Sequence, residues 1–239
     1  VAGLPPLSVR GAIWYQGESN AGDGLRYNYL KEALVKGWRS VFQNEELSFY
    51  WVQLADFGRG HSGQPAGGGW GPVREGQRRA LRVPNTGMAV ILDIGAERDI
   101  HPKNKQDVGY RLSLWALANN YGKDVVPSGP LYASHKIEGN KVRITFDYVG
   151  GGLMVADKGG EYYLDPVSET PAAEITEFSV QDKDGNWHWA KAMIDDETVV
   201  VWSDDVAEPQ NLRYAYDSNP RVNLYNKEGL PASPFTTVD

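Results

Sequence analysis

Residues 7–20 read LSVRGAIWYQGESN, a largely apolar run that changes into polar side chains after Tyr15. The apolar part, residues 7–15, has the length and composition of a buried strand. A helical pattern follows it, with one face formed by Tyr27, Leu30, Leu34 and Trp38. A buried strand that leads into an amphipathic helix is the first half of a β-α-β unit, and it predicts a parallel sheet.

The first half of the chain repeats this alternation of strand and helix. Residues 49–54 and 88–94 are apolar runs typical of strands that are covered on both faces. Residues 72–83 and 104–121 have helical patterns. Residues 57–71 contain seven glycines and form a long loop of the kind that often carries function. We expect polar segments at the carboxyl ends of the strands, where open α/β sheets bind ligands.

The second half of the chain has a different pattern. Short alternating segments such as residues 141–146 are separated by turn signals, among them Asp184-Gly185. These features predict an antiparallel β region. We therefore expect residues 1–127 to form an α/β part and residues 128–239 to form an antiparallel β accessory region packed on it.

Composition excludes several classes of protein. The formal net charge of −7 argues against nucleic-acid binding, which needs a surplus of Lys and Arg. No apolar stretch approaches the roughly 20 residues of a membrane-spanning helix. The absence of cysteine excludes disulfides, a thiol nucleophile and a thiolate metal site. The chain starts at Val1 without a targeting pattern, so we expect any export signal to lie outside this sequence.

One histidine lies in a position that suits catalysis. His101 follows the predicted strand at residues 88–94 through an acidic turn. A neutral imidazole there can take a proton from a hydroxyl nucleophile while a carboxylate orients its other nitrogen. The alternative is a surface histidine at a helix entry. The remaining histidines lie in a glycine-rich loop or in β turns and are weaker candidates: His61, His135 and His188.

Polar residues after the first strand form a second candidate group. Gln16 can donate a hydrogen bond to an oxyanion, and Glu18 can pair with a histidine. The same residues also suit the start of a helix, and both interpretations can hold together. Ser19 lies in Gly17-Glu-Ser-Asn-Ala21, which differs from a Gly-x-Ser-x-Gly nucleophile elbow at Ala21, and this motif alone is a weak signal.

The sequence offers no good metal site. No histidine pair has ligand spacing, and no His-Glu-x-x-His occurs. Asp182-Lys-Asp184-Gly185 lacks the later glutamate of a calcium loop, which favours a hairpin turn.

Several ordered blocks of this sequence resemble the sialate O-acetylesterase family, a branch of the SGNH-hydrolase-like carbohydrate esterases. The blocks are Trp14-Tyr-Gln-Gly-Glu18, Val73-Arg-Glu75 with Gln77, Pro84-Asn-Thr-Gly-Met88, Asp93-Ile-Gly95, Asp99-Ile-His-Pro-Lys-Asn-Lys105, Gly109-Tyr-Arg-Leu112, Arg213-Tyr-Ala215, Asn223-Leu-Tyr-Asn226 and Glu228-Gly-Leu-Pro231. The resemblance covers essentially the whole chain and is specific to the level of the family.

The resemblance implies an SGNH-like parallel sheet flanked by helices, followed by a small antiparallel β domain. It implies a serine esterase, without metal or organic cofactor, that removes O-acetyl groups from sialic acid or related glycans. The family's nucleophilic serine lies in a Gly-Gln-Ser-Asn-Met-type block upstream of these segments, and no such block occurs here. The resemblance therefore implies a carboxy-terminal portion, inactive alone, whose partner is the upstream part of the same protein. It also implies an exported protein, periplasmic or extracellular.

The resemblance assigns roles to individual residues. His101 matches the family's general base, and Gln16 occupies the place of an oxyanion-hole side chain. Related enzymes often carry an aspartate three residues before the histidine, but that position is Arg98 here. The third triad member stays open between Glu18, Asp99 and a backbone carbonyl, with a slight preference for Glu18.

Substrate contacts are expected from the glycine-rich loop and its neighbours. Trp70 and His61 can cover a sugar. Arg74 and Arg98 are candidates to bind a sialate carboxylate bidentately, and Arg74 can equally have a structural role. Acetylxylan or another acetylated polysaccharide is an alternative substrate. A non-catalytic carbohydrate-binding fragment is a further alternative, with binding by aromatic residues of the β region: Trp187, Trp189, Trp202 and Tyr214.

Overall fold

A parallel sheet forms the centre of the first half of the protein. The computed structural model describes residue 3, residues 7–59, residue 65, residues 67–159 and residues 164–238. Within these residues, β1 (Gly11–Trp14), β2 (Ser48–Val52) and β3 (Thr86–Ala89) pair in parallel in the order β1-β2-β3. Every residue of β2 and β3 is buried, as expected for strands covered on both faces. The predicted parallel α/β arrangement is confirmed.

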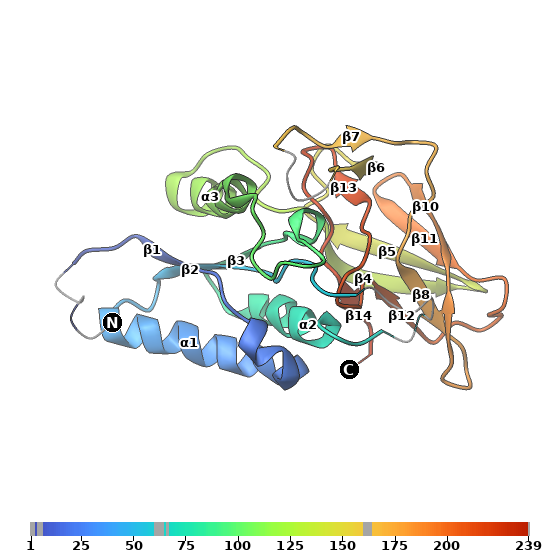
Figure 1. Ribbon diagram of the computed structural model, residues 1–239, viewed down its shortest axis with the longest axis horizontal. Coiled ribbons are helices and arrows are strands. Elements are labelled where there is room, and N and C mark those ends of the chain that lie inside the picture. Colours follow the sequence, from blue (N-terminus) through green and yellow to red (C-terminus); the bar gives the residue numbers. More distant parts are fainter. Residues whose placement is uncertain (1–2, 4–6, 60–64, 66, 160–163, 239) are drawn as a thin grey trace.

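Helices cover both faces of this sheet. Figure 1 shows α3 (Lys105–Tyr121) on one face, and α1 (Tyr27–Phe42) with α2 (Gly71–Arg79) on the other. In the described residues, 3₁₀ segments connect the elements: η1 (Glu18–Arg26), which is kinked at Gly24, η2 (Ala80–Arg82) and η3 (Leu92–Ile94). The chain turns out of α3 at Gly122, whose φ of 59° suits glycine.

The third strand is shorter than the sequence predicts. We expected a strand over residues 88–94, but β3 ends at Ala89 and the apolar run continues as the buried η3 helix. The turn is held by a hydrogen bond from the Ile94 N–H to the Ile91 carbonyl at 3.3 Å. It also directs the Asp93 carboxylate toward α3, so tertiary contacts end the strand where hydrophobicity alone would continue it.

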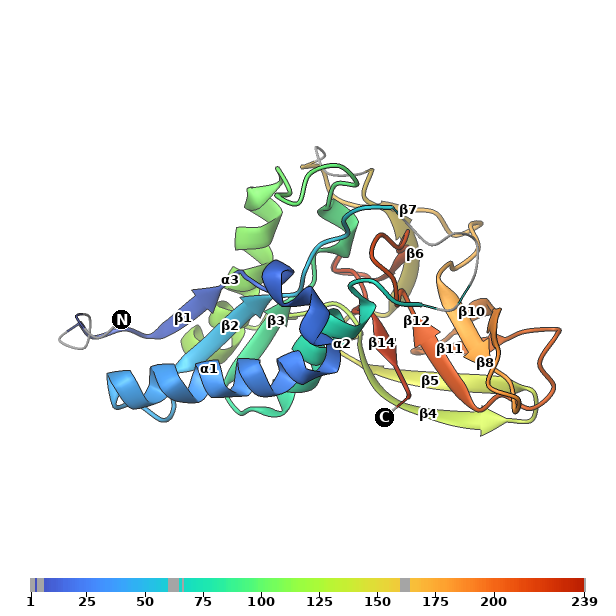
Figure 2. The same ribbon diagram turned by 60° about the horizontal axis from the view of Figure 1, so that its bottom comes forward.

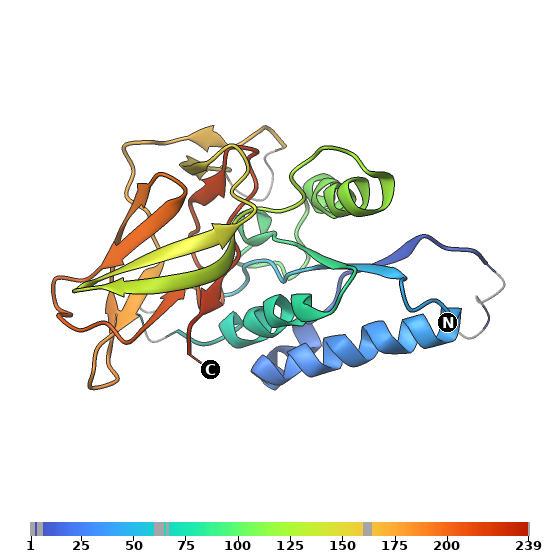
Figure 3. The ribbon, with the colours of Figure 1, turned by 180° about the vertical axis from the view of Figure 1, so that it is seen from behind.

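The second half of the protein is antiparallel β structure (Figure 3). Its strands are β4 (Leu131–Glu138), β5 (Lys141–Asp147), β6 (Leu153–Asp157), β7 (Ser168–Glu169), β8 (Phe178–Gln181), β9 (Trp187–Trp189), β10 (Lys191–Asp195), β11 (Thr198–Trp202), β12 (Asn211–Tyr214), β13 (Leu224–Asn226) and β14 (Phe235–Thr236). They form sheets ordered β10-β11-β5-β4, β14-β12-β8-β9 and β13-β6-β7. The β8–β9 hairpin turns at Gly185, where φ is 87°, as the Asp-Gly signal predicts.

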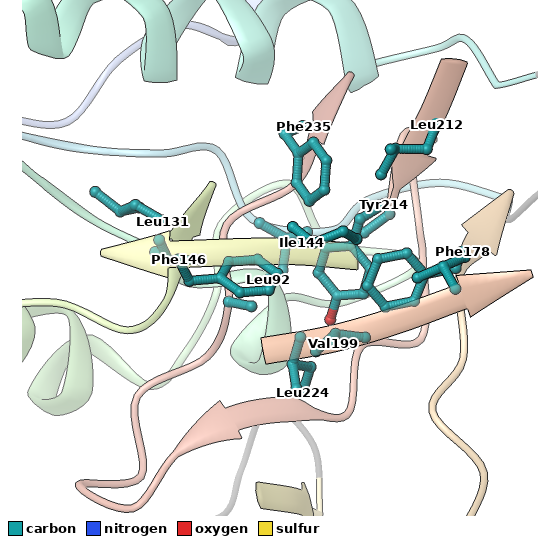
Figure 4. Packing of buried hydrophobic residues seen from close by; sticks show 14 of the residues in the cluster. Leu92, Leu131, Ile144, Phe146, Phe178, Val199, Leu212, Tyr214, Leu224 and Phe235 are labelled. Atoms are coloured by element: carbon teal, nitrogen blue, oxygen red, sulfur yellow. The ribbon is translucent and has the colours of Figure 1, made fainter. Parts of the chain in front are cut away.

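One hydrophobic core joins the two halves. Its aromatic centre lies in the β region, where the rings of Phe178 and Tyr214 are 4.6 Å apart and those of Tyr132 and Phe235 are 4.5 Å apart. Figure 4 shows Leu92, from the α/β half, among these side chains. The predicted division at residues 127 and 128 falls between the end of α3 and the start of β4.

Within the part of the chain that the structure describes, none of the helices combines the length and the apolar character that crossing a membrane requires.

Candidate functional site

The segments that follow the parallel strands meet at the carboxyl edge of the sheet (Figure 2). The segment after β2 runs beside the segment after β3, since Phe57 bridges to Ala96 and the Gly58 N–H donates to the Glu97 carbonyl at 3.0 Å. The segment after β1 joins them through Tyr15, whose ring lies 4.9 Å from Nζ of Lys105. Both polar segments singled out from the sequence are therefore neighbours in space.

His101 is exposed and contacts an aspartate. Its side chain is 82% exposed, and its Nδ1 lies 3.6 Å from Oδ1 of Asp99. The His101 backbone N–H donates to the same oxygen at 2.9 Å, and Lys103 donates to Oδ2. The hydrogen bond from Lys103, followed by the one from His101, lowers the pKa of Asp99 below its usual value. A carboxylate beside Nδ1 favours the tautomer that carries its hydrogen on Nδ1, and Nε2 is then the nitrogen with a lone pair available to other partners.

Glu18 makes a different set of contacts. Its Oε2 accepts a hydrogen bond from the Gly17 N–H at 2.9 Å. No ion pair between Glu18 and His101 occurs among the described residues. The charge of Glu18 acts instead on Lys105, where it opposes the desolvation that lowers the lysine pKa. Of the carboxylates left open by the sequence, the structure brings Asp99 to the imidazole.

Gln16 is held by hydrogen bonds with Tyr27 of α1 and Asn20 of η1. The Tyr27 hydroxyl donates to Oε1 of Gln16 at 2.9 Å and to its carbonyl oxygen at 3.0 Å, while Nε2 donates to Oδ1 of Asn20 at 2.7 Å. Burial, with the nearby charges of Glu18 and Asp23, raises the pKa of Tyr27, so the hydroxyl keeps its proton and remains a donor. The amide orientation is fixed, and its nitrogen carries a second N–H that can serve an oxyanion.

Gly17 and Gln77 bring the first strand's end close to α2. A Cβ at Gly17 would lie 3.2 Å from Nε2 of Gln77, which is tighter than most side chains allow. Gln77 is fully buried, donates to the Val52 carbonyl at 3.1 Å and accepts from the Leu54 N–H at 2.9 Å. The resemblance includes Gln77 without a role, and the structure shows that it extends the hydrogen bonding of β2.

Ser19 has no catalytic partner in the described part of the chain. It lies exposed in η1, and no hydrogen bond joins it to His101 there. Its neighbours Asn20 and Asp23 bond to each other at 2.8 Å, as residues at a helix start do. The geometry lends no support to Ser19 as a nucleophile.

Asp56 is a candidate that the sequence did not single out. It follows β2 at the centre of the edge, where burial raises the pKa of its carboxyl to about 7 against the opposing charge of Arg74. A Cβ at Gly95 would lie 1.9 Å from Oδ1 of Asp56, so glycine is required beside it. Its sequence signal is weak, since it is a single carboxylate shortly after a buried strand.

Arg74 takes the structural role that the sequence left open beside ligand binding. It is completely buried, and its guanidinium donates to backbone carbonyls of residues in two loops: Leu54, Ala55, Asp217 and Ser218. Burial lowers its pKa to about 10, with Asp56 and Asp217 opposing, so it remains charged near neutral pH. Arg74 ties the loop after β2 to the β region.

Trp70 packs beside this arginine. Its ring lies 5.2 Å from that of Phe57 and 5.8 Å from the Arg74 guanidinium carbon, and its backbone N–H donates to Oγ of Ser218 at 3.2 Å. His61 lies outside the described residues. The proposal that this loop covers a sugar therefore stays a prediction.

The other described histidines belong to the β region. His135 Nδ1 lies 2.7 Å from the Tyr132 hydroxyl, and His188 Nε2 lies 2.8 Å from Oδ2 of Asp182. Both make local contacts within their own sheets. In the described residues, no cluster of three or more histidine, aspartate and glutamate side chains has the arrangement of a metal site.

The aromatic residues of the β region are largely engaged by the chain itself. The guanidinium carbon of Arg213 lies 3.9 Å from the Trp187 ring centre, and Nζ of Lys141 lies 5.0 Å from that of Trp202. Tyr214 is fully buried. These contacts give a structural role to three of the four aromatic residues considered for carbohydrate binding.

The fold and this edge together suit one class of protein. An open α/β sheet carries an exposed histidine beside an ionised aspartate at the edge where such sheets bind ligands, an arrangement compatible with a hydrolase that uses a general base.

Comparison with known proteins narrows this class. No protein-family model matches the chain. The sialate O-acetylesterase of Homo sapiens is 32% identical in an alignment over 159 residues that covers 59% of this chain and 30% of that protein. The sialate O-acetylesterase of Rattus norvegicus is 36% identical over 148 residues, covering 54% of this chain and 27% of that protein.

A solved structure extends the similarity to nearly the whole chain. The crystal structure of a carbohydrate acetylesterase from Xanthomonas citri superimposes with a TM-score of 0.85 and 39% sequence identity, covering 98% of this chain and 51% of that one. The chain is a homologue of the sialate O-acetylesterases and has the fold of a carbohydrate acetylesterase, so the predicted family resemblance is confirmed. It spans about half the length of the solved acetylesterase and less than a third of the curated relatives.

Proposed function

We propose that this chain contributes the histidine half of a serine-type esterase that removes O-acetyl groups from sialic acid or related glycans. The observation that carries the proposal is the contact between His101 Nδ1 and Asp99 Oδ1 at 3.6 Å on the ligand edge of the sheet. Support comes from the 39% identity to a carbohydrate acetylesterase over nearly the full length of this chain.

The open edge of the sheet supports a nucleophile that comes from outside this sequence. β1 pairs with β2, and no described strand pairs with its other edge. Ile13 of β1 is 69% exposed, which is unusual in a parallel sheet. A further strand that paired with β1 in parallel would cover this edge and place its carboxyl end next to Gln16. We propose that the nucleophilic serine arrives on such a segment.

The proposed reaction has two stages. The serine Oγ attacks the acetyl carbonyl while His101 Nε2 takes its proton. His101 then gives that proton to the ester oxygen of the sugar as its bond to the acetyl carbon breaks, so the sugar leaves as an alcohol. Gln16 and backbone N–H groups bind the oxyanion, and one such donor lowers the barrier by about 3–4 kcal/mol in other acyl-transfer sites. In the second stage His101 takes a proton from water as the water attacks the serine ester, and it returns the proton to the serine Oγ as the bond to the acetyl group breaks and acetate leaves.

The test is acetate release from 4-nitrophenyl acetate, O-acetylated sialic acid and acetylxylan. We expect activity from the chain extended by its upstream polypeptide, loss of that activity in His101→Ala, and full activity in the control His188→Ala. The ratio between the two glycan substrates decides between a sialate esterase and a polysaccharide deacetylase. Activity of the 239-residue chain alone that disappears in Ser19→Ala would contradict the proposal.

A further inference from the structure

A buried ion pair connects the β region to the segment that carries His101. Lys158 directly follows β6 and is only 8% exposed. Its Nζ lies 2.7 Å from Oδ2 of Asp107 in the first turn of α3, and it also donates to the Asp165 carbonyl at 2.6 Å. A buried ammonium is costly unless it is paired and hydrogen-bonded, and here both conditions are met.

Asp107 in turn holds the residue that begins α3. Asn104 donates from Nδ2 to the same Oδ2 of Asp107 at 2.8 Å, and its Oδ1 accepts the Asp107 N–H at 3.0 Å as the helix N-cap. Asn104 is 3% exposed, so this cap has little freedom. One carboxylate oxygen of Asp107 therefore serves both Lys158 and the cap.

The cap residue Asn104 is close to His101 in the sequence. His101 precedes Asn104 by three residues, and the buried Pro102 between them restricts the backbone further. On the other side, Asp99 accepts the His101 N–H and the Lys103 ammonium. The segment is thus fixed at both ends, and the Asn104 end is the one that Asp107 connects to the β region.

We propose that Lys158 is a positioning residue for His101. Lys158 fixes the Asp107 carboxylate, Asp107 fixes the Asn104 cap, and the cap fixes the short segment that presents the imidazole. The β region then contributes to the geometry of the proposed active site. The catalytic consequence rests on the proposed function, whereas the structural connection does not.

The physical effect of removing the ammonium follows from burial. The side chains of Lys158 and Asp107 are 6% and 18% exposed, so Lys158→Met leaves a mostly buried carboxylate without a cation. Without the ammonium, the carboxylate keeps, among the described residues, only its hydrogen bond from Asn104 Nδ2 and is free to rotate toward solvent. Such a rotation breaks that bond and releases the segment before α3.

The first measurement is the imidazole Cε1–Hε1 NMR signal of His101 in the 239-residue chain, assigned with His101→Ala. We expect Lys158→Met to shift this signal and Lys158→Arg to restore it, while the signals of His135 and His188 stay in place. The matched control is Lys191→Met, which removes an exposed lysine whose ion pair has side chains 63% and 69% exposed. It should leave the His101 signal unchanged.

The second measurement is kinetic, in the form of the protein that releases acetate. We expect Lys158→Met to lower kcat about tenfold to a hundredfold, the size of effect that a small misplacement of a catalytic group produces, with KM within about twofold. Lys158→Arg should recover most of kcat. If Lys158→Met does not fold, the charge-neutral pair Lys158→Met with Asp107→Asn replaces it and should shift the His101 signal as well.

Distinct outcomes separate this inference from the proposed function. An unchanged His101 signal and kcat in Lys158→Met, or no recovery in Lys158→Arg, overturns the positioning role even if His101→Ala abolishes activity. A shifted His101 signal in the 239-residue chain, together with no acetate release by the chain extended by its upstream polypeptide, supports the structural connection and contradicts the esterase proposal.

Discussion

Lys31 lies in α1 with its ammonium in the core of the α/β half. The residue is 1% exposed, and its Nζ makes no hydrogen bond within the described structure. Nζ lies 4.9 Å from the ring centre of Tyr27 and 5.6 Å from that of Trp51. Burial lowers its pKa from 10.5 to about 7, with Glu18 opposing. We predict that Lys31→Met makes the protein more stable at neutral pH and less dependent on pH.

The sign of the pH dependence follows from the two pKa values. Above about pH 7 the folded state holds Lys31 neutral, whereas the unfolded chain keeps it charged up to its usual pKa of 10.5. Unfolding therefore takes up a proton in this range, and the free energy of unfolding falls as the pH decreases from about 10.5 to about 7. With about 1.4 kcal/mol for each pKa unit, the wild type should lose roughly 2 kcal/mol relative to Lys31→Met between pH 9 and pH 7.

Urea unfolding at pH 6, 7, 8 and 9 measures this difference. The Lys31→Met variant should exceed the wild type most at pH 6 and 7, and its advantage should shrink by pH 9. Lys36→Met is the control on the same helix, because the Lys36 side chain is 68% exposed, and its curve should run parallel to that of the wild type. An advantage of Lys31→Met that stays constant from pH 7 to pH 9 would refute the reasoning.

Three further predictions concern stability. Gly87→Ala places a Cβ 2.3 Å from Cδ2 of Trp115 and should lower the free energy of unfolding by about 1–3 kcal/mol or more in urea titrations. Asp93→Asn breaks a buried pair with Arg111, whose nitrogens lie 2.5 and 2.7 Å from the carboxylate, and should cost about 3–5 kcal/mol by the same measurement. Asp56 has its pKa raised by burial from 3.8 to about 7, so the folded state binds the extra proton and stability should fall as the pH rises from about 4 to 7. Thermal melts of Asp56→Asn should show a smaller decline over that range, and an equal decline would contradict the assignment.

Local patterns predicted most of the fold. Residues 49–54 are apolar except for Gln53, and the structure makes β2 a fully buried central strand. The same reasoning extended β3 too far, because periodicity does not register that Asp93 must reach Arg111 on α3. Hydrophobicity predicts that a segment is buried. It does not predict where the strand ends, because that depends on contacts with residues far away in the sequence.

The site was predicted less completely, for a related reason. Arg74 beside a glycine-rich loop looks like an arginine that binds a ligand. The structure directs it to carbonyls of the β region, one of them 143 residues away in the sequence. Asp56 belongs to no recognisable sequence motif. It becomes a candidate site residue only because folding buries its carboxyl and so raises its pKa.

By itself the sequence determined the parallel α/β half, the antiparallel β half and the polar segments that contain Gln16 and His101. Burial periodicity and turn chemistry are expressed within a few residues, so these features need no knowledge of distant neighbours. Only the tertiary structure decided that Asp99 is the carboxylate in contact with the imidazole and that Arg74 is a buried tie between loops. It alone joined Lys158 to α3, because hydrogen bonds and ion pairs depend on which distant atoms the fold brings within about 3 Å.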